Sequence, residues 1–348
     1  MTILVTGGTG FLGTYLVDRL ACEGHVVRVL DQYLPSHNGK EKGNRSVEFL
    51  AGDIRDEALV RQACEGVETV FHLAALPSIA RGNAALYESI NVGGTRNVLE
   101  RAKACGARKT VYVSSSTVYG VPAHFPCREE NSLQPIGPYG RSKVKAETLC
   151  MSFADRGFSV SIIRPRVIIG AGRIGIFSIL FDRIRSNQTV YILGNGKNIF
   201  QLTHVSDMVE GCVLASRVPS SDIFNIGSTI LYPIREELEG LIRHARSRSR
   251  IASIPPRLGR TLLRAALRLG VSPLVEEQFT IADRNFRLDT TKAERLLGWI
   301  PRKSNVEALI ESFDWYVGHP EEIGQQYRGL FNLFGRFNHH RLGAFQSR

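Results

Sequence analysis

The sequence has few cysteines, and they are arranged neither as metal ligands nor as obvious disulfide partners. Its 348 residues include six cysteines, scattered along the chain without a CxxC pair or a Cys/His spacing. We therefore expect reduced thiols that fill the core, with no disulfide framework and no metal site. No apolar run approaches the roughly 20 residues that cross a bilayer. Because Met1 leads almost directly into an apolar run, we expect no signal peptide and predict a cytoplasmic protein.

The chain also lacks a recognisable nucleic-acid-binding motif, although it is basic. Lys and Arg number 44 against 33 Asp and Glu, for a formal net charge of +11. Such an excess suits nucleic acid, an anionic membrane surface or an acidic substrate. Without a motif to support the first of these, we predict no nucleic-acid partner.

The basic residues cluster late in the sequence, and one cluster has helical spacing. If residues 257–269 form a helix, arginines occupy one side and apolar residues the other. The simpler interpretation is a lobe helix with a solvated cationic face, and the alternative is peripheral contact with an anionic membrane. The basic tail, residues 331–348, is interpreted as a poorly ordered end or as a dimer or membrane contact. The apolar positions of the predicted helix are Leu258, Leu262, Ala266 and Leu269.

The first functional signal is the stretch TGGTGFLG, which follows the apolar run Ile3-Leu4-Val5 and precedes an amphipathic segment. A glycine-rich turn between a strand and a helix is the arrangement that binds a dinucleotide pyrophosphate. The anion then lies at a helix N-terminus, where free N–H groups and the helix dipole favour negative charge. The predicted cofactor contacts here are Gly7, Gly10, Phe11, Leu12 and Gly13.

An acidic residue about 20 positions beyond the glycines indicates which dinucleotide binds. Asp31 ends the second apolar run, where a carboxylate accepts hydrogen bonds from the adenosine ribose. The same carboxylate would repel the 2′-phosphate of NADP. We therefore predict NAD as the cofactor.

Apolar strands alternate with helical patterns through the first half of the chain, which predicts βαβ units and a parallel sheet. Polar and small residues follow several of these strands, at the edge where such sheets bind ligands. Asp53 and Ile54 are predicted to contact adenine, with a helix N-cap as the alternative role for Asp53. Asn91 is predicted to interrupt or cap a long helix. The small residues expected beside the cofactor are Ala74 and Ala75.

The chemical signal is a tyrosine and a lysine four residues apart, Tyr139 and Lys143, preceded by the hydroxyl-rich stretch Ser114-Ser115-Ser116-Thr117. On a helix the two residues share one face. An ammonium beside a phenol favours the phenolate, which lowers the phenol pKa from near 10 and produces a base. We therefore predict an acid/base centre.

With these residues in place, the chain resembles the extended short-chain dehydrogenase/reductase superfamily, and most closely its NAD-dependent epimerase/dehydratase family of nucleoside-diphosphate-sugar epimerases. The motifs in common are TGGTGFLG, GDIRD, HLAA, NVGGT, SSSTVYG and PYGRSK. The resemblance implies a Rossmann-type doubly wound parallel sheet. It also implies that Tyr139 is the acid/base, that Lys143 holds the nicotinamide ribose and lowers the Tyr139 pKa, and that Ser115 binds the reacting oxygen.

The resemblance further implies the reaction and the layout of the chain. A hydroxyl is oxidised by bound NAD, and the keto-sugar then rotates within the site. Reduction on its other face completes the epimerisation. Residues 1–166, completed by about 204–227, are expected to form the NAD-binding domain. Residues 167–203 and 228–330 are expected to form an interleaved substrate lobe, and the protein is expected to be a homodimer.

Departures from the family pattern bear on the substrate. Many sugar-nucleotide epimerases carry a diphosphate-binding arginine where this chain has Phe200, and the apolar residues around Phe200 resemble the 3β-hydroxysteroid dehydrogenases. Two alternatives therefore stay open: an NAD-dependent steroid-like alcohol dehydrogenase, and a non-catalytic NAD-binding module. Ser116 and Thr117 stand where dehydratases place an acidic pair, which disfavours dehydration. The predicted substrate residues are Ser116, Thr117, Arg173, Arg284 and Arg287.

Overall fold

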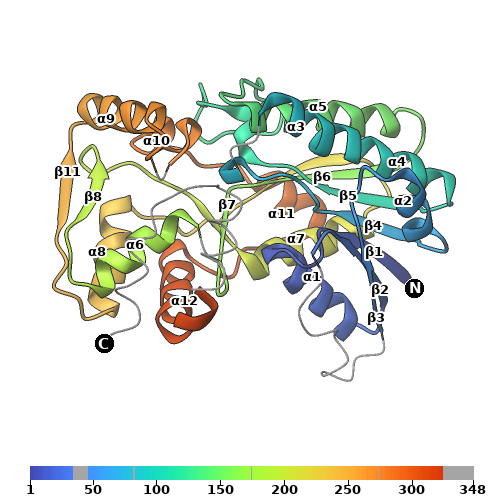
Figure 1. Ribbon diagram of the computed structural model, residues 1–348, viewed down its shortest axis with the longest axis horizontal. Helices are drawn as coiled ribbons and strands as arrows, with labels where there is room; N and C mark the ends of the chain where they lie inside the picture. The colour runs from blue at the N-terminus through green and yellow to red at the C-terminus, as the bar shows by residue number, and fades with distance from the viewer. Residues whose placement is uncertain (34–45, 81–82, 174, 273, 324–348) are drawn as a thin grey trace.

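The computed structural model describes residues 1–33, 46–80, 83–173, 175–272 and 274–323. Its centre is a seven-stranded sheet in the order β10-β6-β5-β4-β1-β2-β3, and every neighbouring pair of strands is parallel. The strands are β1 Thr2–Thr6, β2 Val26–Asp31, β3 Val47–Ala51, β4 Thr69–His72, β5 Lys109–Val113, β6 Ser159–Pro165 and β10 Asp222–Ile226. This sheet confirms the predicted doubly wound α/β fold (Figure 1).

Helices cover both faces of the sheet, as right-handed crossovers between parallel strands require. One core cluster packs α1 (Phe11–Cys22), α7 (Val205–Arg217) and α11 (Thr291–Leu297) on the sheet through Leu16, Met208 and Leu297. The other face carries further helices, packed through Val60, Leu99 and Ala146 among others. These helices are α2 Glu57–Cys64, α4 Thr95–Ala104 and α5 Pro138–Ala154.

A smaller lobe lies at the other end of the molecule (Figure 1). It contains two two-stranded parallel sheets, β7 Val167–Ile169 with β9 Leu202–His204, and β8 Val190–Leu193 with β11 Ile251–Ile254. Its core gathers around Phe181, Leu241 and Phe313. The lobe helices are α6 Ile176–Arg185, α8 Ile234–His244, α9 Pro256–Arg268, α10 Glu276–Ile281 and α12 Asn305–Gly318. Because β10 returns to the main sheet between them, the lobe segments are interleaved with it. The predicted tail, 331–348, lies outside the described residues.

The predicted helix at 257–269 is present as α9, but its packing differs from a simple two-sided pattern. Gly259 is buried against Leu193, while Leu258 and Leu262 are 53% and 57% exposed. Arg257, Arg264 and Arg268 fall on a third side, whereas Arg260 pairs with Asp283. The helix therefore packs on the lobe through one narrow face and leaves an apolar stripe beside the cationic one. None of the helices in the described segments is both long and apolar enough to cross a membrane.

A short helix and a π-helix precede α4: α3 covers Ala84–Tyr87, and the π-helix η3 covers Glu88–Gly94. Asn91 lies inside η3, so it interrupts the helix rather than capping it. Its Oδ1 accepts a hydrogen bond from the Leu76 N–H at 2.7 Å, and its Nδ2 donates to Ser142 Oγ at 2.9 Å. Asn91 thus ties the segment after β4 to helix α5.

A buried ion pair joins α5 to the sheet. Arg164 Nη2 lies 2.6 Å from Glu147 Oε2, and both side chains are only 3% exposed. Ser114 at the end of β5 also donates to Glu147, and Arg164 Nη1 donates to the Tyr119 hydroxyl at 2.8 Å. Removing one partner of such a pair leaves an uncompensated charge in the interior.

We predict that Arg164→Ala lowers the free energy of unfolding by about 3–5 kcal/mol, the usual cost of breaking a buried ion pair. The matched control is Lys145→Ala on the same helix, because the pair of Lys145 with Glu88 is exposed. That change should cost at most about 1 kcal/mol. Urea unfolding of the two variants measures both values, and equal losses would contradict the prediction.

Candidate active site

The glycine turn after β1 is packed so closely that side chains cannot replace Gly7 or Gly13. Gly7 has a φ of +73°, and a Cβ on it would lie 2.7 Å from the Ala74 amide nitrogen. A Cβ on Gly13 would lie 2.2 Å from the Gly7 carbonyl oxygen. At Gly10, by contrast, the nearest atom to a Cβ is 3.3 Å away, and Gly10 precedes the first turn of α1. The loop therefore presents backbone N–H groups at a helix N-terminus, as a pyrophosphate requires.

The two aspartates predicted to bind the adenosine end lie at neighbouring strand ends. Asp31 ends β2, and its Oδ2 accepts a hydrogen bond from the Thr9 N–H at 3.1 Å, which ties it to the glycine turn. Asp53 Oδ2 lies 2.6 Å from Arg55 Nη2, and hydrogen bonds from Arg55 lower the pKa of Asp53. The alternative role for Asp53 is wrong, because Asp56 caps α2. Both carboxylates therefore lie as hydrogen-bond acceptors at the carboxyl edge of the sheet.

The remaining predicted cofactor contacts surround this edge. Ala74 and Ala75 are half-buried just after β4, and the Ala74 N–H donates to Thr6 Oγ1 at 3.4 Å. Ile54 is only 6% exposed, and its side chain packs beneath Gly94 within the core. Its contact with adenine stays a prediction.

Ser115 and Tyr139 meet at the end of β5. Ser115 caps the short 3₁₀ helix η4 (Ser116–Tyr119), and Tyr139 lies in the first turn of α5. Desolvation raises the pKa of Tyr139 to about 12, although a hydrogen bond with Ser115 opposes the rise. The sequence analysis expected Lys143 to lower this pKa. The structure does not show that effect.

The reason is the position of the lysine. Lys143 is 2% exposed, and its Nζ donates to the Val113 carbonyl oxygen at 2.8 Å and to the Tyr112 hydroxyl at 3.1 Å. Both hydrogen bonds hold the ammonium at the end of β5, and Lys143 lies one helical turn after Tyr139. Burial lowers the pKa of Lys143 to about 8, which leaves the ammonium as the main form at neutral pH.

The three predicted substrate arginines differ in their contacts and burial. The Arg173 Cζ lies 5.2 Å from the centre of the Phe11 ring, and the charge of Arg173 acts to lower the pKa of Tyr139. Arg173 therefore lies between the glycine turn and the acid/base residue. Arg287 is half-buried with an unpaired Nε, whereas Arg284 is exposed. Of the three, Arg173 is the one whose charge is seen to act on Tyr139, and the substrate roles of all three stay predictions.

The two hydroxyl residues after Ser115 that were predicted to bind substrate both contact other groups of the protein. Thr117 donates from its backbone N–H at 3.2 Å and from its hydroxyl at 3.0 Å to Ser115 Oγ. Ser116 is buried, and its Oγ lies 3.4 Å from Arg166 Nη1. Thr117 thus orients the serine, while Ser116 contacts an arginine that the sequence analysis did not select.

Two residues that sequence reasoning missed border this site. Arg166 directly follows β6 and is 3% exposed. Glu277, from helix α10 of the lobe, accepts hydrogen bonds from the backbone N–H groups of Gly137 and Gly140 at the start of α5. The position of Arg166 just past a parallel strand was a signal that could have identified it. Nothing in the sequence marks Glu277, because its partners are backbone groups of a distant segment.

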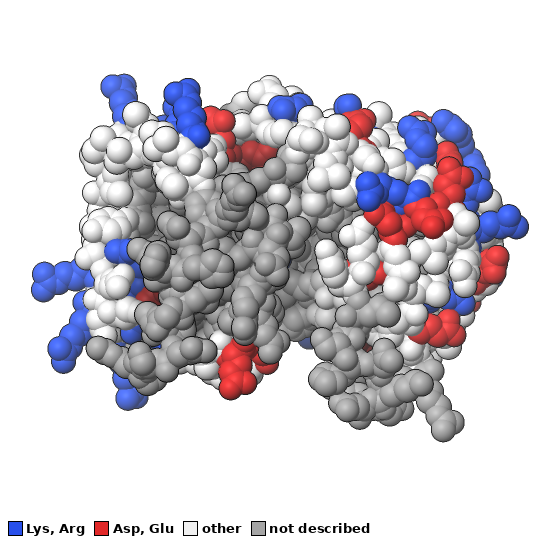
Figure 2. All heavy atoms as spheres, in the orientation of Figure 1, with Lys and Arg blue, Asp and Glu red and all other residues white. Residues whose placement is uncertain are grey.

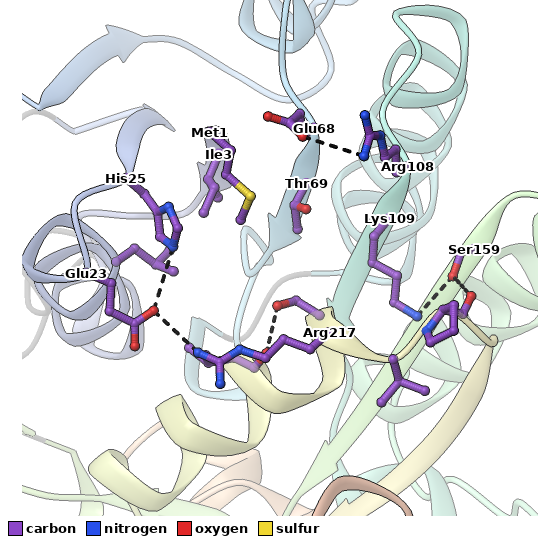
Figure 3. Close-up of a pocket in the computed structure, with 15 residues that line it drawn as sticks. Met1, Ile3, Glu23, His25, Glu68, Thr69, Arg108, Lys109, Ser159 and Arg217 are labelled. Carbon is purple, nitrogen blue, oxygen red and sulfur yellow. Dashed lines mark hydrogen bonds and ion pairs between the residues drawn. The ribbon is translucent and has the colours of Figure 1, made fainter.

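A separate pocket of about 480 Å³ lies at the opposite edge of the sheet. Figure 3 shows Met1, Thr69, Lys109 and Ser159, at or beside the amino ends of their strands, around it. Several of its charged groups already have partners, such as Arg217 with Glu23 at 3.6 Å. Parallel α/β sheets bind ligands at their carboxyl ends, so the glycine turn and Tyr139 define the candidate active site.

The model of the NAD dependent epimerase/dehydratase family matches residues 3–227. The chain belongs to this family and is an NAD-dependent enzyme of the extended short-chain dehydrogenase/reductase class. The glycine turn fits that cofactor, because Gly10 stands without a side chain at the N-terminus of α1. That Asp31 holds the ribose stays a prediction.

The relatives span epimerases and sterol dehydrogenases. The chain is 38% identical over 327 residues to an uncharacterised protein of Sinorhizobium fredii, covering 93% of this chain and 81% of that protein. It is 29% identical over 331 residues to the UDP-glucose 4-epimerase of Mycolicibacterium smegmatis, covering 91% and 98%. It is also 29% identical over 332 residues to the mouse sterol-4-alpha-carboxylate 3-dehydrogenase, covering 89% and 90%.

Solved structures with the same fold contain the ligands of the sugar branch. The UDP-glucose 4-epimerase of Thermotoga maritima, crystallised with UDP-glucose, superposes with a TM-score of 0.76 at 28% identity, covering 92% of this chain and all of that one. MoeE5 in complex with UDP-glucuronic acid and NAD superposes with a TM-score of 0.73 at 27% identity, covering 91% and 99%.

The carboxylate of Asp31 generates a prediction about cofactor choice. NAD should bind far more tightly than NADP, because a 2′-phosphate beside Asp31 places two negative charges in contact. Asp31→Ala should narrow that difference, mostly by weakening NAD. Titration calorimetry of both cofactors against both proteins measures it. Equal affinities of the unaltered protein for the two cofactors would contradict this role of Asp31.

Proposed function

We propose that the protein is an NAD-dependent epimerase of a nucleotide-activated sugar that acts through a transient keto intermediate. The observation that carries the proposal is the Ser115–Tyr139 pair at the carboxyl end of β5, beside a glycine turn fitted to a dinucleotide. A module that only binds NAD needs the turn but not the acid/base pair. The sugar-epimerase names of the relatives support the substrate class.

In this proposal the protein residues bind the sugar and manage one proton. Bound NAD supplies the acceptor and donor of hydride. Tyr139 takes the proton of the reacting hydroxyl through its phenolic oxygen, and Ser115 holds the same hydroxyl oxygen by hydrogen bonding. Because desolvation holds the Tyr139 pKa near 12, positive charge must favour the phenolate during turnover. Arg173 is the cation placed for this role, because its charge acts to lower the Tyr139 pKa, and Lys143 lies one helical turn away on the same helix.

We predict that Tyr139→Phe reduces the epimerisation rate by about 10²- to 10⁴-fold, the usual loss when a general acid/base is removed. NAD affinity should stay nearly unchanged, because the ring remains in place. Tyr87→Phe is the matched control, since the Tyr87 ring lies 6.1 Å from the Tyr139 ring but carries no acid/base role. Near-normal turnover in Tyr139→Phe would contradict the mechanism.

The second candidate function is net oxidation of a 3β-hydroxysteroid-like alcohol. Phe200 favours it, because that ring stands where many sugar enzymes have a diphosphate-binding arginine, and the mouse sterol dehydrogenase is a relative. The two functions differ in what happens to the cofactor. Net oxidation accumulates NADH in proportion to product, whereas epimerisation regenerates NAD in every cycle. Absorbance at the NADH band with a UDP-sugar and with a 3β-hydroxysterol separates them.

We propose in addition that helix α9 contacts an anionic membrane surface. Leu258, Leu262 and Leu269 are 53%, 57% and 77% exposed, and at 100° per residue they form one stripe beside the stripe of Arg257, Arg264 and Arg268. Lys and Arg side chains project from this end of the molecule (Figure 2). Adjacent apolar and cationic stripes are typical of helices that lie in the interface of anionic bilayers.

With this membrane contact, the protein should sediment with vesicles that contain phosphatidylglycerol and only weakly with pure phosphatidylcholine vesicles. Its binding to the anionic vesicles should fall as the salt concentration is raised. The double change Leu258→Ser and Leu262→Ser should weaken it several-fold. Ile300→Ser is the control, because Ile300 is 71% exposed outside α9. If the double variant instead binds vesicles normally but shifts from dimer to monomer in analytical ultracentrifugation, the surface is a dimer contact and the membrane proposal is wrong.

A further inference from the structure

Arg166 is a buried arginine at the catalytic edge of the sheet. It directly follows β6, and its backbone N–H donates to the Ile226 carbonyl oxygen at 3.0 Å. Its Cζ lies 4.6 Å from the centre of the Phe200 ring and 3.9 Å from that of Phe286. The Phe286 N–H donates to the Ile199 carbonyl oxygen at 2.9 Å, which fixes the two phenylalanines as neighbours. Two aromatic rings therefore hold the guanidinium in one orientation.

Only one end of this guanidinium is hydrogen-bonded. Arg166 Nη1 lies 3.4 Å from Ser116 Oγ, whereas Nε and Nη2 have no partner among the described residues although both are buried. The Nε–H and the adjacent Nη2–H form the parallel pair of donors with which arginine binds two oxygens of a carboxylate or phosphate at once. The free edge is thus the one that recognises oxyanions.

A buried cation without an anion is costly, and folds rarely keep one without a reason. Burial lowers the pKa of Arg166 to about 9, and no acidic group among the described residues offsets this. Ser116, which holds the other end, is next in the chain to Ser115. The charge therefore lies beside Ser116, one residue along the chain from Ser115, and no acidic side chain in the described part of the chain balances it.

We propose that the Nε/Nη2 edge of Arg166 binds an oxyanion of the substrate. The inference rests on the proposed epimerase function and names the group that replaces the arginine missing at position 200. A cation is still present beside Phe200, because the Phe200 ring packs against the guanidinium of Arg166, which directly follows β6. The oxyanion is a phosphate of the nucleotide diphosphate or the carboxylate of a sugar acid, since both present two oxygens to the fork.

The test is titration calorimetry of the NAD-loaded protein and of Arg166→Met with UDP, UDP-glucose and UDP-glucuronic acid. Methionine keeps a long apolar side chain between the rings but removes the charge. Loss of a desolvated, charge-assisted bidentate contact should weaken binding about 10- to 100-fold. Weaker binding of all three ligands identifies a phosphate as the oxyanion, and weaker binding of UDP-glucuronic acid alone identifies the carboxylate. Unchanged affinity for all three overturns the proposal.

Arg183→Met is the matched control, because Arg183 also stacks on an aromatic ring, with its Cζ 5.0 Å from the centre of the Tyr191 ring, but lies in the lobe helix α6. It should leave all three affinities unchanged. Arg166→Lys keeps the charge without the fork and should recover only part of the affinity. NAD affinity should be the same in every variant.

Thermal unfolding separates a binding role from a structural one and does not require a sugar substrate. Without ligand, Arg166→Met should melt at the same temperature as the unaltered protein or higher, because an apolar side chain replaces an unpaired buried charge. Pyrophosphate should raise the melting temperature of the unaltered protein more than that of Arg166→Met. If pyrophosphate does so while no UDP-sugar binds, the anion site stands and the epimerase function fails. A lower melting temperature in Arg166→Met with unchanged ligand affinities overturns the site.

Discussion

The position of helix α5 depends on the buried carboxylate of Glu147. It accepts hydrogen bonds from Arg164 on β6 and from Ser114 at the end of β5, so that one side chain fixes the helix to two adjacent strands. One turn earlier, Lys143 donates to the Val113 carbonyl oxygen and adds a second tie to β5. Tyr139 follows one turn further toward the amino end of the helix. Residues at i, i+4 and i+8 share a face, and the two buried ties therefore orient the acid/base residue.

The positive charges around the site favour an anionic ligand. Lys143, Arg166 and Arg173 bring three positive charges to the carboxyl edge of the sheet, and Arg166 has no acidic partner among the described side chains. Glu277 is the opposing charge near Tyr139, where it raises the phenol pKa and accepts hydrogen bonds from the start of α5. A negatively charged substrate would balance this arrangement, because unpaired buried charges are costly.

Contiguous signals in the sequence were enough for the fold and the cofactor. The glycine turn, Asp31 and the Tyr139–Lys143 spacing each depend on neighbours within one strand-turn-helix unit or one helical turn, so their geometry follows from local rules. The spacing did not show that Lys143 would reach back to Val113 and leave the Tyr139 pKa high, because that contact lies in the tertiary structure. Likewise, the periodicity of α9 separated arginines from leucines but did not show that the leucines face solvent.

Arg166 shows most clearly what the sequence alone left out. Its neighbours Ser116, Phe200 and Phe286 come from three distant segments, and the substitution at position 200 suggested a missing cation when viewed by itself. Only the folded chain shows a guanidinium against that phenyl ring.

The central claim, a hydride removed and returned at one carbon, is tested most directly with an isotopic label. UDP-glucose deuterated at C4, the carbon named for the related epimerases, is incubated with the NAD-loaded protein and the product is examined by NMR. We predict an epimer that retains deuterium at C4 on the opposite face, without net NADH. Deuterium lost to solvent, or accumulated in NADH with a keto product, would contradict it.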